Sequence, residues 1–143
     1  MLFGLFNKRK RPVFGQAGAS ERETLLAEAR EHVAGRRHAA AEILFEMLVE
    51  RFPADAEIHN EWGALHYARG EFAEAEAAFR AALNLTATYP SALANLGQSL
   101  QVRGRFADAR PLFEAALRLD PGHSSALFNL AVEIGRASCR ERV

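Results

Sequence analysis

The stretch NEWGALHYARGEFAEAEAAFRAALNL, residues 60–85, recurs as ANLGQSLQVRGRFADARPLFEAALRL, residues 94–119. The two align without a gap at a spacing of 34 residues. The shared residues include Gly63 with Gly97, Arg69 with Arg103, Gly70 with Gly104, Phe72 with Phe106, Ala75 with Ala109, Phe79 with Phe113, Ala82 with Ala116, Leu83 with Leu117 and Leu85 with Leu119. A repeat of this length indicates an array of stacked helical units.

The same period extends in both directions. A weaker first copy places Ala29, Ala41 and Phe45 on Gly63, Ala75 and Phe79, and a fourth copy begins at Ser124. We therefore expect repeats at about 22–55, 56–89 and 90–123, with a partial repeat at 124–132. Together they form an array over residues 21–132.

Each copy has the pattern of two helices. In the second copy, apolar and aromatic residues recur at steps of three and four in both halves, as expected for amphipathic helices. Gly70 and Gly104 fall between the halves, where glycine permits a left-handed turn. We expect Gly63 and Gly97 to lie opposite Ala75 and Ala109 with no side chain between the helices, so that the two backbones approach closely.

Boundary residues agree with these helices. The sequence SERE, residues 20–23, predicts a capping box that opens the first helix. Pro53 and Pro121 are expected just beyond helix ends, and Asp55 or Ser124 can cap the helices that follow. Pro111 is predicted to bend the second helix of the third copy without ending it.

This unit resembles the tetratricopeptide repeat, a helix pair of 34 residues with small residues at points of close packing. GEFAEAEAAFRAALNL (70–85) and GRFADARPLFEAALRLDP (104–121) carry the resemblance most clearly, whereas the first copy departs from it at Glu28 and Arg36. The resemblance implies an all-α, α-solenoid fold of antiparallel helix pairs. It also implies a concave groove, lined by the first helix of each pair, that binds a peptide or helix of a partner protein, without catalysis.

The resemblance suggests which residues line this groove. Asn95 and Asn129 lie one repeat apart on groove-lining helices, where a side-chain amide can both donate to and accept from a peptide backbone. Asparagine is also the ordinary choice of the family at this position, so a purely structural role is the alternative. Asn60 is one step out of this register and Glu61 occupies it. The other candidates for the groove are Glu57, Tyr67, Gln98 and Gln101.

The charged residues of the chain limit the chemical class of partner that we expect. The groove-facing positions of the second and third copies offer no lysine or arginine, which argues against the clamp that some relatives close on a C-terminal carboxylate. Arg69 and Arg103 are expected to end their helices, where a cation favours the helix dipole. Residues 12–132 carry 11 basic and 16 acidic side chains, which argues against a nucleic-acid partner.

The sequence offers no enzymatic or metal site. His32, His59 and His66 do not form the i, i+4 pair of a helical zinc site, and half-buried packing positions are the alternative. The only cysteine, Cys139, excludes a disulfide within the chain. No serine, histidine and acid group themselves for catalysis. We therefore expect no cofactor, no bound metal and no small-molecule substrate.

The two ends of the chain are read separately. Residues 1–20 are expected to be a basic, disordered tail, and weak membrane contact through residues 1–11 is an alternative for MLFGLF followed by KRKR. No secretory signal or spanning segment is recognised, which favours a cytoplasmic location.

The closing stretch EIGRASCRERV, 133–143, can be written in codons that match a sequencing adapter. We therefore expect it to be non-native read-through of a chain interrupted in its fourth repeat. On that reading, an alternative function is the docking region of a larger transferase.

Overall fold

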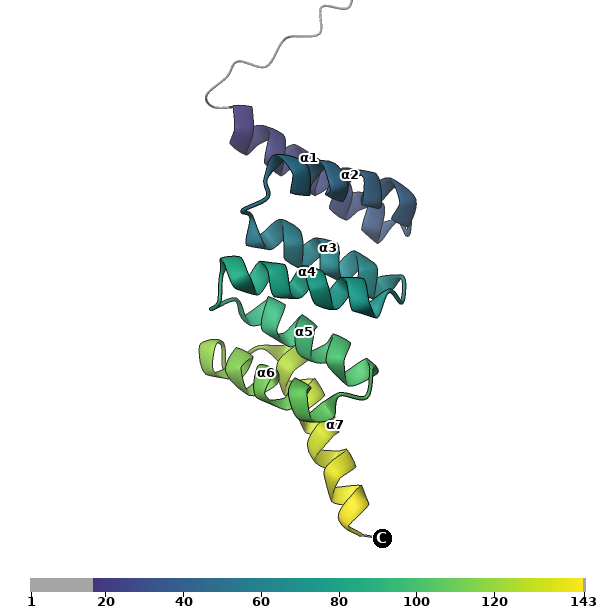
Figure 1. Cartoon of the computed structure of the whole chain (residues 1–143), viewed down its shortest axis with the longest axis vertical. Helices are drawn as coiled ribbons and strands as arrows, with labels where there is room; N and C mark the ends of the chain where they lie inside the picture. Colours follow the sequence, from purple (N-terminus) through teal and green to yellow (C-terminus); the bar gives the residue numbers. More distant parts are fainter. Residues whose placement is uncertain (1–16, 143) are drawn as a thin grey trace, which may run out of the picture.

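The computed structural model describes residues 17–142, which form seven α-helices and no strand (Figure 1). Their bounds are α1 Ala17–Ala34, α2 His38–Arg51, α3 Ala56–Ala68, α4 Phe72–Leu85, α5 Pro90–Val102, α6 Phe106–Leu119 and α7 Ser124–Glu141. None of these helices combines the length and apolar character needed to cross a membrane. The predicted all-α class is confirmed.

The helices stack in chain order as antiparallel pairs, α1 with α2, α3 with α4, and α5 with α6 (Figure 1). Each pair also packs on the first helix of the next, and α3 lies beside α5 as α5 lies beside α7. This is the predicted α-solenoid: every helix contacts its neighbours in the stack.

Three phenylalanines one period apart fill the centre of the helix pairs. Phe45, Phe79 and Phe113 are at most 1% exposed. A Cβ built on Gly63 would lie 2.6 Å from Phe79 Cε1, and one on Gly97 would lie 2.7 Å from Phe113 Cε1. The expectation that no side chain lies between the helices at these glycines was wrong, because an aromatic ring fills the space beside each of them.

The turns within the pairs depend on left-handed residues. Gly70 and Gly104 have φ of +80° and +77°, as predicted. In the first copy this conformation is taken by Arg36, with φ of +55°, although Gly35 is its neighbour. Gly35 N–H instead donates to the Glu31 carbonyl at 2.9 Å and so continues the hydrogen-bond pattern of α1. The turn therefore keeps the register of the repeat at the cost of placing a Cβ in an unfavourable region.

Two of the predicted caps differ from the structure. Asp55 caps α3 as predicted, since its side chain accepts from the backbone N–H groups of Glu57 and Ile58. The capping box at Ser20 was wrong, because α1 begins at Ala17 and the Ser20 carbonyl accepts from Thr24 Oγ1 at 2.7 Å within the helix. Residues 17–20 are accordingly helical and not part of a tail. At α7 the cap is His123, whose Nδ1 accepts from Ala126 N, and Ser124 is the first helical residue.

The positions of the prolines agree with the helix ends, and α7 is longer than the repeat predicts. Pro53 and Pro121 lie beyond the ends of α2 and α6, as predicted, and α6 passes through Pro111 without interruption. Helix α7 continues through the stretch from residue 133 to Glu141, because its Arg, Ala and Glu residues favour helix without an apolar stripe. The origin proposed for 133–143 stays a prediction. The tail and membrane-contact hypotheses concern residues 1–16, which lie outside the described part.

Apolar side chains remain uncovered at the last helix. Leu127, Phe128, Val132 and Ile134 of α7 are between 38% and 70% exposed.

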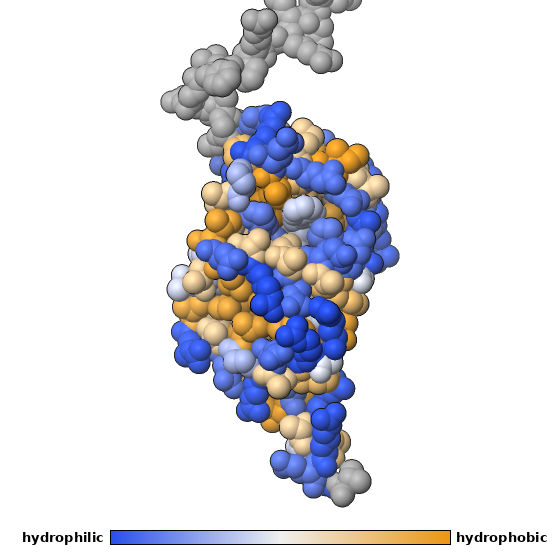
Figure 2. All heavy atoms as spheres, viewed as in Figure 1, coloured by the Kyte–Doolittle hydropathy of each residue, from blue (hydrophilic) through white to orange (hydrophobic). Residues whose placement is uncertain are grey.

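On the face drawn in Figure 2, hydrophobic residues gather toward the middle of the array and hydrophilic ones dominate around them. The buried apolar residues divide into two clusters, one joining α1 and α2 to α3 and one running from α4 to α7.

Candidate functional site

All eight candidate residues lie on the first helices of the pairs. Helices α1, α3, α5 and α7 lie side by side, and we call the surface that they form the odd-helix face. The candidates on α3 are Glu57, Asn60, Glu61 and Tyr67; those on α5 are Asn95, Gln98 and Gln101; Asn129 is on α7.

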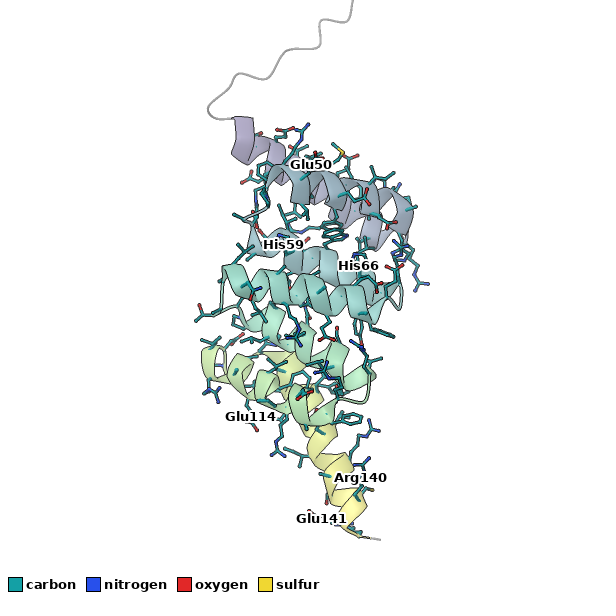
Figure 3. The ribbon with its side chains drawn as sticks, in the orientation of Figure 1. Glu50, His59, His66, Glu114, Arg140 and Glu141 are labelled. Atoms are coloured by element: carbon teal, nitrogen blue, oxygen red, sulfur yellow. The ribbon has the colours of Figure 1, made fainter. Side chains whose placement is uncertain are left out.

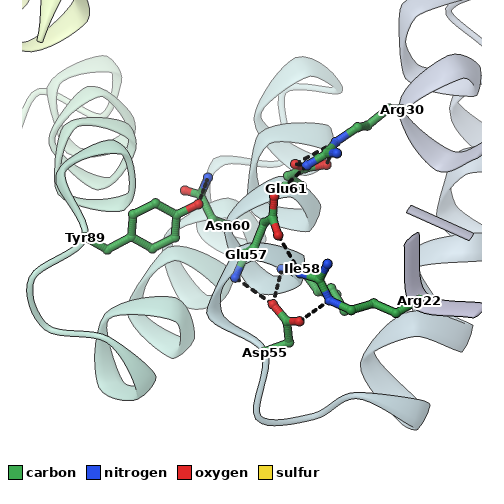
Figure 4. A network of polar contacts seen from close by, with 8 residues as sticks. All are labelled: Arg22, Arg30, Asp55, Glu57, Ile58, Asn60, Glu61 and Tyr89. Atoms are coloured by element: carbon green, nitrogen blue, oxygen red, sulfur yellow. Dashed lines mark hydrogen bonds and ion pairs between the residues drawn. The ribbon is translucent and has the colours of Figure 1, made fainter. Parts of the chain in front are cut away.

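Two arginines of α1 bind the acidic residues at the start of α3 (Figure 4). Arg22 pairs with Asp55 and with Glu57. Arg30 donates from Nε to both carboxylate oxygens of Glu61 at 2.9 Å, and from Nη2 to Glu57 at 2.7 Å. Sequence analysis placed Glu57 and Glu61 in a groove without nearby bases. The structure brings both carboxylates against arginines of the preceding repeat.

These contacts shift the titration of the acidic groups. The hydrogen bond from Arg22, with that from Arg30, lowers the pKa of Glu57 against the opposing effect of burial. Burial alone would raise the pKa of Asp55, but the bonds from Arg22 and from the backbone of Ile58 bring it below its usual value. Both carboxylates therefore stay charged and paired at neutral pH.

A chain of amide contacts continues from α3 to α5. Asn95 Nδ2 donates to Asn60 Oδ1 at 3.0 Å, and Asn60 Nδ2 donates to the Tyr89 hydroxyl at 3.5 Å. Asn60 is buried and Asn95 is half-buried. Asn60 is one position out of register with Asn95, yet the two side chains meet. Their hydrogen bond joins residues 35 apart, one more than the repeat length. The Asn95 amide keeps its oxygen and one N–H for a further partner.

The remaining candidates differ in how available their polar groups are. Asn129 is 7% exposed, and its Nδ2 donates to the Ser125 carbonyl of its own helix at 2.8 Å. Tyr67 packs edge-on against Phe72, with ring centroids 5.3 Å apart. Gln98 and Gln101 are half-buried on α5, and within residues 17–142 neither side chain makes a hydrogen bond. The available amides are thus concentrated on α5.

Arg69 and Arg103 join successive repeats, a role that the sequence analysis missed. Both follow the last residue of their helices, as predicted. Arg69 Nη1 contacts Glu42 of α2 at 2.6 Å, and Arg103 pairs with Glu76 of α4, which is 8% exposed. Glu42 and Glu76 are themselves one period apart, and this was the signal in the sequence that could have revealed the pairing.

His59 and His66, which are labelled in Figure 3, lie on α3. Both line a hollow between α3 and α4. His66 Nδ1 contacts Glu71 Oε2 at 2.7 Å and His59 Nε2 contacts the Pro53 carbonyl at 2.9 Å. The hollow has a volume of about 450 Å³ and is otherwise lined by Trp62, Glu74, Ala77, Ala78 and Ala81. Within the described residues no three His, Cys, Asp or Glu side chains are grouped as metal ligands.

The sequence matches the model of the tetratricopeptide repeat over residues 26–92 and 95–132. No curated protein matches it.

Several solved structures share the fold. The first such domain of Spaghetti (RPAP3), bound to an HSP90 peptide SRMEEVD, has a TM-score of 0.78 at 16% identity and covers 83% of this chain and 94% of its own. The Yersinia enterocolitica secretion chaperone SycD, with a peptide of the translocator YopD, has a TM-score of 0.77 at 15% identity, covering 89% and 99%. A Thermobaculum terrenum O-GlcNAc transferase mutant has a TM-score of 0.79 at 25% identity, covering 84% of this chain but 23% of its own.

Proposed function

Because the chain belongs to the tetratricopeptide repeat family, we propose that it is a protein-interaction module whose odd-helix face binds a peptide segment of a partner. Two of the similar structures are complexes with peptides, one from HSP90 and one from YopD. The role is one of binding without catalysis. The transferase neighbour aligns with 23% of its own chain and carries no argument for an enzymatic role here.

The observation that carries this proposal is the set of amides on α5. Asn95, Gln98 and Gln101 lie on one helix and retain hydrogen-bonding groups that the chain does not use. A side-chain amide offers both a donor and an acceptor, which matches the alternating N–H and C=O groups of an extended peptide backbone. Such contacts hold a chain with little dependence on its side chains.

The test begins with peptides selected from a displayed library on the full-length chain and measured by titration calorimetry. Gln98→Ala with Gln101→Ala should weaken the selected peptide about tenfold, the loss expected for one or two hydrogen bonds. Asn95→Ala should also weaken it, although this change additionally leaves buried Asn60 without its partner.

Asn84→Ala is the matched control, because Asn84 is an exposed asparagine on the second helix α4. The Asn84→Ala variant should bind the selected peptide with the same affinity as the unaltered chain. If the glutamine variants bind as tightly as the Asn84 variant, the peptide does not use α5 and the proposed face is wrong.

A further inference from the structure

The odd-helix face contains its own counter-ions. From Ala17 to Val132, the first helices hold two arginines, Arg22 and Arg30, and no lysine. Both arginines are on α1, and both are bound by acidic residues of the next repeat. Within residues 17–132, a carboxylate ligand arriving at this face finds no arginine or lysine that is not already paired.

The geometry of these pairs favours the internal partners. Arg30 directs its Nε and Nη2 groups at Glu61, and the same Nη2 also donates to Glu57. Arg22 spans Glu57 and Asp55. Planar, two-pronged contacts of this kind are the strong form of the arginine–carboxylate pair. Glu61 and Arg22 are only 21% and 25% exposed, so water screens them incompletely.

The odd-helix face carries a net negative charge where α1 meets the start of α3. Three carboxylates, those of Asp55, Glu57 and Glu61, surround two guanidinium groups. A fourth carboxylate from a ligand would be repelled by those already present, whereas a lysine or arginine would complete the pairing. Helix α5 carries no charged residue, and it holds the amides of Asn95, Gln98 and Gln101.

Building on the binding role proposed above, we propose that Glu57 and Glu61 set the specificity of the odd-helix face by occupying Arg22 and Arg30. The face accordingly takes an extended segment that carries a basic residue opposite α3 and no acidic residue, and it rejects acidic C-terminal peptides. Glu57 and Glu61 act by positioning and neutralising the arginines, and they also supply the surplus negative charge.

The test uses fluorescence anisotropy at low ionic strength with the full-length chain and two labelled hexapeptides. The acidic probe is GSEEED with a free carboxyl terminus, and the basic probe is GSKKQN with an amidated terminus. The unaltered chain should bind the basic probe more tightly. In the double variant Glu57→Gln, Glu61→Gln the acidic probe should gain at least tenfold, and adding Arg22→Gln and Arg30→Gln should abolish that gain.

Two results would overturn the proposal: tighter binding of the acidic probe by the unaltered chain, or no gain in the double variant. Neither depends on the amides of α5, so the peptide-binding role can fail or stand independently. Asp55 is left unchanged because it caps α3. Should the double variant lose helicity in circular dichroism, Glu61→Gln alone must still give a gain, since Arg30 then retains only Glu57.

Discussion

Gly63→Ala should destabilise the array although alanine is the better helix former. Gly63 is buried in α3, and the space that a methyl group would need is filled by Phe79. The added Cβ would lie 2.6, 2.7 and 3.1 Å from three carbons of that ring. Normal carbon contacts begin near 3.5 Å, so the ring or the helix must move by several tenths of an ångström or more.

The size of the effect follows from two opposing contributions. Phe79 is 1% exposed, so its ring cannot turn into solvent and the overlap costs close to the upper end of the range for overpacking, about 3 kcal/mol. Replacing glycine by alanine inside a helix stabilises the folded state by about 1 kcal/mol through helix propensity. The net loss in the free energy of unfolding is therefore about 2 kcal/mol, or roughly 6–12 °C in Tm for a domain of this size.

Urea and thermal unfolding followed by circular dichroism measure this loss. Gly122→Ala is the control, because its new Cβ would meet Asp120 Oδ1 at an ordinary 3.6 Å. In the first copy the same position holds Ala29, which is fully buried, and Ala29→Gly should also destabilise, through lost packing and helix propensity. If Gly63→Ala is neutral or stabilising, the glycine does not set the spacing of α3 and α4.

Three further predictions concern the turns and ion pairs. Arg36→Gly should raise the free energy of unfolding by about 1 kcal/mol, since it relieves a left-handed φ of +55°, and an unchanged Tm would contradict this. Arg103→Ala should lower it by about 1 kcal/mol by withdrawing a partner from buried Glu76, and an equal loss in high salt would argue against an electrostatic cause. Because the folded pKa values of Asp55 and Glu76 are lowered, their stabilisation is present above their unfolded values near pH 4 and is lost as pH falls through the folded ones. Arg22→Gln should flatten that acid limb in a pH series of urea titrations, and an unaltered limb would show that other groups cause it.

The helices could be predicted from the sequence because their signal is repeated. A buried phenylalanine every 34 residues, with glycine at the turn, fixes both the type and the register of each pair. The errors arose where one copy departs from the others. At Arg36 the register of the repeat outweighs the backbone preference for the neighbouring Gly35, and at Ser20 the preceding alanines extend the helix past a good capping residue.

The site was harder to predict because its contacts join different repeats. A side chain of one first helix meets the next first helix about one period later, and the pairs Arg22–Glu57 and Asn60–Asn95 are both separated by 35 residues. Comparing residues at equal positions, as for Asn95 and Asn129, finds equivalent residues and not contacting ones. Asn129 illustrates the difference, since it bonds within its own helix.

Ion pairs between residues 27 apart join α2 to the end of α3 and α4 to the end of α5. They place Glu42 against Arg69 and Glu76 against Arg103. In the third copy Arg110 replaces this acid and bonds to Glu114 of its own helix at 3.1 Å. The Glu42–Arg69 and Glu76–Arg103 pairs hold successive repeats together at the ends of α3 and α5, and the Arg22–Glu57 and Asn60–Asn95 pairs lie on the odd-helix face. Charge in this array therefore serves first to join repeats. The groups left for a partner are the uncharged amides of α5 and the surplus negative charge at the start of α3.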